Sequence, residues 1–176
     1  MKIILIKYGE LTTKKDNRKV FINILYNNIK KALINYKVNI IKTRDRMYIE
    51  TEENIDEVVD ILKNIFGIHS IVVATRVNTN TEEIEVNVLE VAKNIEFNTF
   101  KVETTRSDKS FPIPSMDFSR RIGSLILKNI PNKKVDVHNP DYLLHIEIRK
   151  DYTYIYHKEI KASGGYPVSV AGRGLL

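Results

Sequence analysis

Five basic side chains lie between residues 106 and 128, in a loop and in the helix expected after it: Arg106, Lys109, Arg120, Arg121 and Lys128. Within that helix Arg121, Ser124 and Lys128 follow at intervals of three and four residues, so they share one face, opposite an apolar stripe. Cations grouped on one face can neutralise several phosphates at once. The pattern favours a nucleic-acid interface, and a solvated helix face is the alternative.

The loop at residues 106–114 adds an aromatic ring to this charge. Phe111 stands between Ser110 and Pro112, where its ring could offer a stacking surface to an unpaired base. A loop that proline merely stiffens, without contact to RNA, is the alternative.

Catalytic and metal-binding patterns are not apparent. The chain has no cysteine, which excludes disulfides, thiolate metal sites and a thiol nucleophile. Its four histidines lack metal-ligand spacing, and no Ser-His-Asp arrangement is present. We therefore expect no cofactor, no metal site and no catalysis by this chain alone.

The charge of the chain fits a polyanionic partner. The 176 residues carry a net charge of +6 with a pI near 9.3, in two basic blocks separated by residues 79–98, which hold one basic and five acidic side chains. Nucleic acid is the expected partner. The alternative explanation of the high pI is a proteome rich in Lys, Ile and Asn, which raises the pI without any anionic partner. The longest apolar run has four residues, far short of the roughly 20 that span a bilayer, and no signal core is present. We expect a cytoplasmic protein without membrane contact.

Apolar periodicity predicts an α+β protein with two domains. Over residues 1–77 the order of elements is β-α-β-β-α-β, which is a ferredoxin-like arrangement. A polar break follows, where either Thr79 and Glu82 or Asn80 and Glu83 have the capping-box offset. Residues 78–163 form a second α/β domain, in which Ser115 is the expected N-cap of a helix and Tyr152–Ile160 a single strand. Residues 164–176 are expected to be a linker.

Several stretches in chain order carry a resemblance to a known family, among them Lys7-Tyr8-Gly9-Glu10-Leu11, Phe100-Lys101-Val102, Arg106-Ser107-Asp108-Lys109-Ser110-Phe111-Pro112, Asn139-Pro140-Asp141, His145-Ile146-Glu147-Ile148-Arg149 and Gly164-Gly165-Tyr166-Pro167-Val168. They resemble the N-terminal half of the tRNA 4-thiouridine synthetases, ATP-dependent tRNA sulfurtransferases that are also tied to thiamine biosynthesis. The resemblance implies a ferredoxin-like domain, then a THUMP domain, which is an RNA-binding module. It also implies an ATP pyrophosphatase domain that is missing from this chain and would begin just after Leu176.

The resemblance implies a division of labour. In that family the THUMP domain holds the 3′ acceptor end of tRNA, and the missing domain adenylates and thiolates uridine 8. ATP and Mg²⁺ as cofactors, and a cysteine desulfurase as sulfur donor, are implied for the full-length enzyme; homodimer formation is left open. The candidate RNA-binding residues are Lys101, Arg106, Lys109, Ser110, Phe111, Pro112, Arg120, Arg121, Lys128 and Arg149. The residues of the 106–112 loop and Arg149 match the family pattern. The assignment of the helix cations Arg120, Arg121 and Lys128 depends on their charge alone.

Two other functions compete with this interpretation. A stand-alone RNA-binding adaptor could recruit a separate modification enzyme, and continuation of the gene past Leu176 into Ser-Gly-Gly-x-Asp-Ser would exclude it. A small ferredoxin-like enzyme such as an acyl phosphatase is disfavoured, because Tyr8-Gly9-Glu10-Leu11 has one glycine and an acid where a phosphate-cradling loop is needed.

Overall fold

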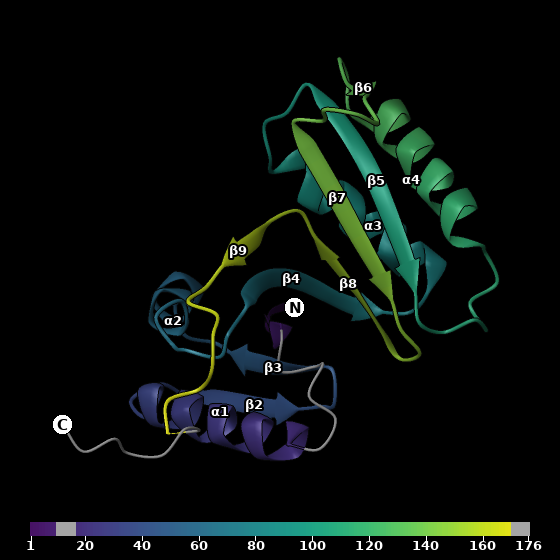
Figure 1. Ribbon diagram of the computed structural model, residues 1–176. Helices are drawn as coiled ribbons and strands as arrows, with labels where there is room; N and C mark the ends of the chain where they lie inside the picture. The colour runs from purple at the N-terminus through teal and green to yellow at the C-terminus, as the bar shows by residue number, and fades with distance from the viewer. Residues whose placement is uncertain (10–16, 170–176) are drawn as a thin grey trace. The chain divides into compact units, whose positions relative to one another are not determined.

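The computed structural model describes residues 1–9 and 17–169 (Figure 1). The chain divides into two compact units: the first unit is Lys2–Val73 with Glu159–Leu176, and the second unit is Ala74–Lys158 with Met1. The division falls inside strand β4 (Ser70–Asn78), whose residues from Ala74 onward belong to the second unit. Glu10 and Leu11 of the first motif, and residues 170–176 of the expected linker, lie outside the described residues.

The first unit has the expected ferredoxin-like fold. Its elements are β1 (Lys2–Lys7), α1 (Arg18–Ala32), β2 (Val38–Lys42), β3 (Arg46–Thr51), α2 (Ile55–Leu62) and the start of β4. The strands lie in the order β2-β3-β1-β4, with β3 antiparallel to both β2 and β1. The apolar stripes of both helices are buried in one core with the sheet, which is why the helical spacing predicted them.

Gly9, two residues after β1, adopts a conformation that favours glycine. Its φ is +58°, and a Cβ at this position would lie 2.6 Å from Cβ of His69. The backbone N–H of His69 donates to the Lys7 carbonyl oxygen at 3.0 Å, which fixes this close approach. The Tyr8-Gly9 motif is therefore explained by packing.

The C-terminal segment returns to the first unit. Strand β9 (Glu159–Lys161) is antiparallel to Ser70–Val72 of β4, so the single strand expected over Tyr152–Ile160 is wrong: it breaks at His157 and Lys158, and its halves pair separately. Farther on, the Gly67 N–H donates to the Gly164 carbonyl oxygen at 2.8 Å, and Tyr166 packs near Phe21 with ring centroids 5.8 Å apart. Residues 159–169 are thus docked on the first unit.

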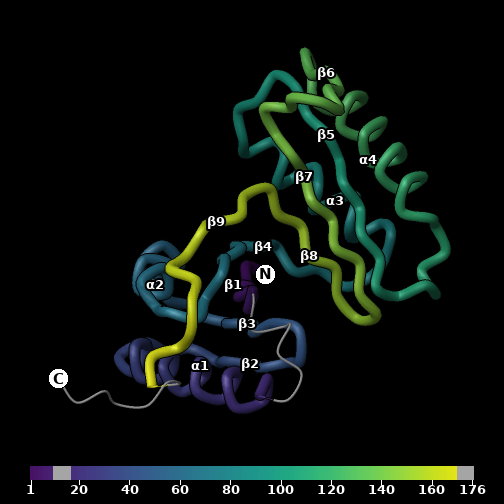
Figure 2. The backbone as a smooth tube through the Cα atoms, viewed as in Figure 1, coloured from purple at the N-terminus to yellow at the C-terminus, as the bar shows by residue number. Residues whose placement is uncertain are grey.

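The second unit is an α/β layer. It contains the end of β4, α3 (Thr81–Lys93), β5 (Thr99–Arg106), α4 (Ser115–Asn129), β6 (Lys134–Val135), β7 (Tyr142–Ile148) and β8 (Tyr152–Tyr156). The strand order is β4-β8-β7-β5-β6, with β5 parallel to both β7 and β6. Helix residues such as Ile84 and Ile122 share a core with Phe100 and Ile146 of the sheet. Figure 2 shows β5 and β7 side by side with α4 along β5.

The two predicted helix caps have different outcomes. The side chain of Asn80 accepts from the N–H groups of Glu82 and Glu83, which confirms it as the N-cap of α3. Ser115 is instead the first residue of α4, and Pro114 holds the N-cap position without a side-chain hydrogen bond. Among the described helices, none is long and apolar enough to cross a membrane.

Candidate nucleic-acid interface

A groove of about 620 Å³ lies between α4 and the outer edge of β5 in the second unit. It exists because β6 pairs with β5 only at Thr99 and Phe100, and no other strand in the described part of the chain covers that edge. Ser119 of α4 takes the place of a strand partner. Its Oγ accepts the Thr104 N–H at 3.1 Å, and its hydroxyl donates to Thr104 Oγ1 at 2.9 Å.

The walls of the groove combine small polar residues with exposed apolar ones. Ser115, Ser119 and Gly123 repeat every four residues along α4, and the space where Gly123 would carry a Cβ is open to 4 Å. The apolar wall is formed by side chains that are 44–70% exposed: Met116, Leu127, Val135 and Val137. Apolar surface next to hydroxyl donors suits unstacked nucleotides, whose bases need both.

Two of the predicted RNA-binding residues line this groove. Arg120 is 74% exposed and has a long ion pair, 3.6 Å, with Asp117 one turn earlier. Lys101 donates from Nζ to Glu103 Oε1 at 2.7 Å, and this hydrogen bond lowers the pKa of Glu103. The charge of Lys101 is therefore largely compensated, whereas Arg120 presents its charge to solvent.

The loop at 106–114 is held from within. The Arg106 guanidinium donates to the carbonyl oxygens of Phe111 at 2.7 Å and Ile113 at 3.1 Å. Asp108 accepts from the N–H and the hydroxyl of Ser110, which lowers the pKa of its carboxyl. These contacts occupy Arg106 and Ser110 in shaping the loop.

Phe111 does not present a stacking surface. Its ring is only 6% exposed and packs edge-to-face on Phe118 with centroids 5.3 Å apart. The expected role in base stacking is wrong for this conformation, because the ring is part of the core. The predicted loop residues that remain exposed are Lys109, Ser110 and Pro112.

The predicted basic face of α4 is divided between two surfaces. Arg121 points to α3, where its Nε donates to Glu85 Oε1 at 2.5 Å, and this hydrogen bond raises the pKa of Arg121. Neighbouring helix positions are about 100° apart, so Arg120 and Arg121 serve different sides. Lys128 is exposed in the last turn, seven residues after Arg121.

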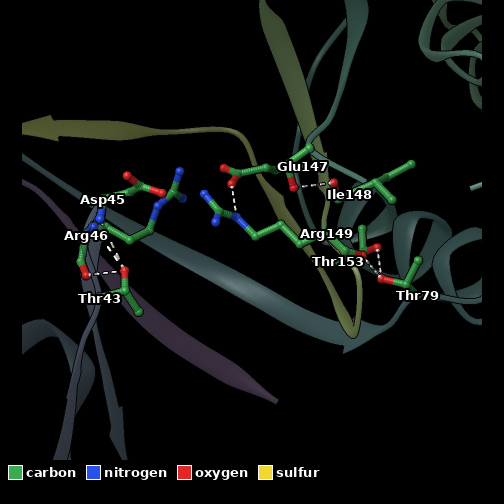
Figure 3. Close-up of polar contacts among 9 residues, drawn as sticks. Thr43, Asp45, Arg46, Thr79, Glu147, Ile148, Arg149 and Thr153 are labelled. Atoms are coloured by element: carbon green, nitrogen blue, oxygen red, sulfur yellow. Dashed lines mark hydrogen bonds and ion pairs between the residues drawn. The ribbon is translucent and has the colours of Figure 1, made fainter. Parts of the chain in front are cut away.

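Arg149 lies at the β7–β8 turn (Figure 3). Its Nε donates to Glu147 Oε1 at 2.6 Å, and the two side chains are 27% and 11% exposed. The Arg149 carbonyl oxygen accepts the Thr79 hydroxyl at 2.7 Å, and Thr79 Oγ1 lies 3.0 Å from Thr153 Oγ1. These contacts give Arg149 a structural role.

The groove itself was missed from the sequence. The repeat of small residues at 115, 119 and 123 was a usable signal, since small residues four apart leave a furrow along a helix. The open strand edge had no local signal, because it depends on how short β6 is. Within residues 1–9 and 17–169, no group of three or more His, Asp or Glu side chains is placed to hold a metal ion.

Two family models match the chain: the ThiI ferredoxin-like domain over residues 3–72 and the THUMP domain over residues 78–158. The chain therefore belongs to the class of proteins in which a ThiI ferredoxin-like domain is followed by a THUMP domain.

Similar curated proteins are named "Probable tRNA sulfurtransferase". The protein of Thermoanaerobacter pseudethanolicus is 49% identical over 175 residues, which are 99% of this chain and 46% of that protein. The protein of Macrococcus caseolyticus is 44% identical over 98% of this chain and 44% of its own length. The chain therefore spans about half the length of these curated relatives.

Solved structures share both domains. A protein from Pyrococcus horikoshii matches with a TM-score of 0.86 and 33% identity, over 98% of this chain and 59% of its own. A 4-thiouridine synthetase in complex with RNA and bound ATP matches with a TM-score of 0.84 and 31% identity, over 98% of this chain and 45% of its own.

Proposed function

We propose that this chain is the tRNA-binding part of a tRNA sulfurtransferase that makes 4-thiouridine at position 8 of tRNA. The observation that carries the proposal is the pairing of a ThiI ferredoxin-like domain with a THUMP domain, at 49% identity over 99% of the chain to a protein named for this activity. The related structure that holds RNA supports RNA as the ligand. With tRNA as its ligand, the protein is proposed to act in the cytoplasm.

The chemistry belongs to the whole enzyme rather than to these residues. The proposal assigns ATP, Mg²⁺ and sulfur transfer from a cysteine desulfurase to a catalytic domain of the full-length protein, and the link to thiamine biosynthesis goes with it. In this division of labour, the described residues hold and orient the tRNA.

The groove between α4 and β5 is the proposed seat of the unpaired 3′ end of tRNA. The groove is wide because Gly123 has no side chain and because no strand pairs with β5 at Lys101 on this edge within the described residues. Bases can therefore lie against Met116 and Leu127 while Arg120 contacts a phosphate. A duplex offers no unstacked bases, so the groove should discriminate ends from stems.

Filling the groove tests this proposal directly. Gly123→Leu should weaken tRNA binding by at least about tenfold, because the added side chain takes the space of a nucleotide. It should not unfold the unit, because a Cβ added at this position meets no atom within 4 Å and glycine is about 1 kcal/mol worse than leucine in a helix. Fluorescence anisotropy with labelled tRNA measures the affinity, and thermal unfolding checks the fold.

Two comparisons complete the experiment. A tRNA trimmed of its unpaired 3′ end should bind the native chain as weakly as intact tRNA binds the Gly123→Leu variant. Arg120→Gln should weaken binding, while Arg121→Gln, with the same charge change on the other side of α4, should change it little. Equal binding of intact and trimmed tRNA would refute the acceptor-end assignment.

A further inference from the structure

A second basic cleft lies in the first unit, far along the sequence from the groove just described. It has a volume of about 650 Å³ and is bounded by the first turns of α1 and by the end of β2 with the turn after it. Four of its lining residues are cations: Arg18, Lys19, Lys42 and Arg44. No carboxylate lines it within the described part of the chain. Figure 1 shows α1 and β2 beside each other.

Arg18 is fixed at the wall of this cleft with donor capacity to spare. Its Nη2 donates to the Arg44 carbonyl oxygen at 2.7 Å, and Asp45 Oδ1 lies 3.7 Å away. The side chain is 18% exposed, and its buried Nε has no hydrogen-bond partner among the described residues. The hydrogen bond to the turn therefore holds the guanidinium of Arg18 at the wall of the cleft.

Lys42 is held in place on the opposite side. Its Nζ donates to Asn23 Oδ1 at 2.5 Å and lies 4.7 Å from the ring centroid of Tyr26. Neither partner carries a negative charge, so the ammonium keeps its full charge while its position is restricted. Less side-chain entropy is therefore lost when an anion binds. Lys19 and Arg44 are exposed beside these two anchored cations.

We propose that this cleft binds the phosphodiester backbone of RNA, as a contact separate from the groove in the second unit. The inference rests on the proposed function, because it takes RNA as the ligand. Four cations from α1, β2 and the turn after β2 line the cleft, and Asp45 is the acid paired to them among the described residues. This charge exceeds what a single phosphate needs. A phosphodiester chain presents repeated charges that match such a set. Contacts to phosphates position a nucleic acid without reading its sequence.

The test removes the two cations that the turn and β2 contribute. Lys42→Gln together with Arg44→Gln should lower tRNA affinity at least about tenfold and make the log–log salt dependence shallower by roughly 2, one per lost phosphate contact. The matched control is Lys30→Gln with Lys31→Gln. These lysines are exposed in the last turn of α1 and outside the cleft, so the same loss of charge there should have a much smaller effect.

The outcomes separate this inference from the proposed function. Failure of the native chain to prefer tRNA over heparin would overturn the proposed function. If the native chain binds tRNA and the cleft variant binds as the control does, only the cleft assignment fails. Competition by inorganic phosphate at the cleft, with unchanged tRNA affinity in the cleft variant, would make it a small-anion site and overturn the RNA assignment. Thermal unfolding of both variants excludes loss of structure as the cause.

Discussion

Arg106 and Phe111 stand five residues apart in one loop, and each explains the other's position. The guanidinium donates to the Phe111 carbonyl oxygen, and the ring turns into the core against Phe118. A charged donor shared by two carbonyl oxygens ties the loop down at both ends of the Phe111–Ile113 stretch. Any loss of RNA binding in an Arg106 variant would therefore act through the shape of the loop.

Phe111→Ala should reduce stability before it affects recognition. Removing a buried phenyl ring costs about 3–5 kcal/mol of unfolding free energy, because the cavity next to Phe118 cannot fully collapse. Urea denaturation measures this cost, and Pro112→Ala in the same loop is the exposed control, expected within about 0.5 kcal/mol of the native chain. A Phe111→Ala variant of native stability with weakened RNA binding would restore the stacking role.

At the scale of elements, Asp141 fastens the start of β7 to the start of β5. Its Oδ2 accepts the N–H groups of Asn98 and Thr99, each at 3.1 Å, while its own N–H donates to Thr99 Oγ1 at 3.0 Å. The N–H groups of Thr99 and Asn98 lower the pKa of the Asp141 carboxyl. This clasp sets the register of the parallel pair in which Phe100 faces Tyr142, and that pair borders the groove.

The clasp predicts a pH dependence of defined sign. A carboxyl whose pKa is lowered in the folded state stabilises the fold above the ordinary aspartate value, and this contribution is lost as pH falls through the lowered pKa. Native stability should therefore exceed that of Asp141→Asn at neutral pH, and the gap should narrow between about pH 5 and pH 2. Urea denaturation across that range measures it; a gap that widens on acidification would contradict the assignment.

At this scale, the sequence could predict the features whose signals lie within a few residues of one another. The helices were predictable because their buried residues recur at helical spacing, and Asn80 as a cap because its partners are two and three residues away. The break between β8 and β9 was not, since each half pairs with a different part of β4, about 75 to 90 residues away. Burial of Phe111 was equally invisible: a lone ring in a Ser- and Pro-containing loop has no periodicity.

At the scale of the whole molecule, the net charge of +6 is the sum of separate surfaces. The acidic α3 engages Arg121 through Glu85, so part of the basic charge is neutralised within the second unit. Among the remaining basic side chains, Arg120 lies beside the groove with only a long ion pair to Asp117, and Lys42 and Arg44 line the cleft of the first unit. Each unit therefore offers its own cationic site to an RNA.

Combining the two sets of variants tests whether one tRNA uses both sites. Contacts that do not share partners add in free energy, so Gly123→Leu with Lys42→Gln/Arg44→Gln should lower tRNA affinity by the product of the separate losses. A short unpaired RNA with the sequence of the 3′ end should respond to Gly123→Leu alone. The groove offers this RNA Arg120, and Lys101 only in competition with Glu103, so about one to two phosphate contacts and a log–log salt slope of roughly −1 are expected.

Anisotropy titrations measure the affinities and salt slopes needed for this comparison. They are made from low to moderate salt with the native chain, the two single-site variants and the combined variant. If the combined loss equals the larger single loss, the two sites do not act on the same tRNA. If the short RNA loses as much affinity in the cleft variant as in the groove variant, its contacts extend to the first unit and the separation of roles is wrong. A salt slope near zero would remove the electrostatic argument for both sites, since released counterions are what make phosphate contacts salt-dependent.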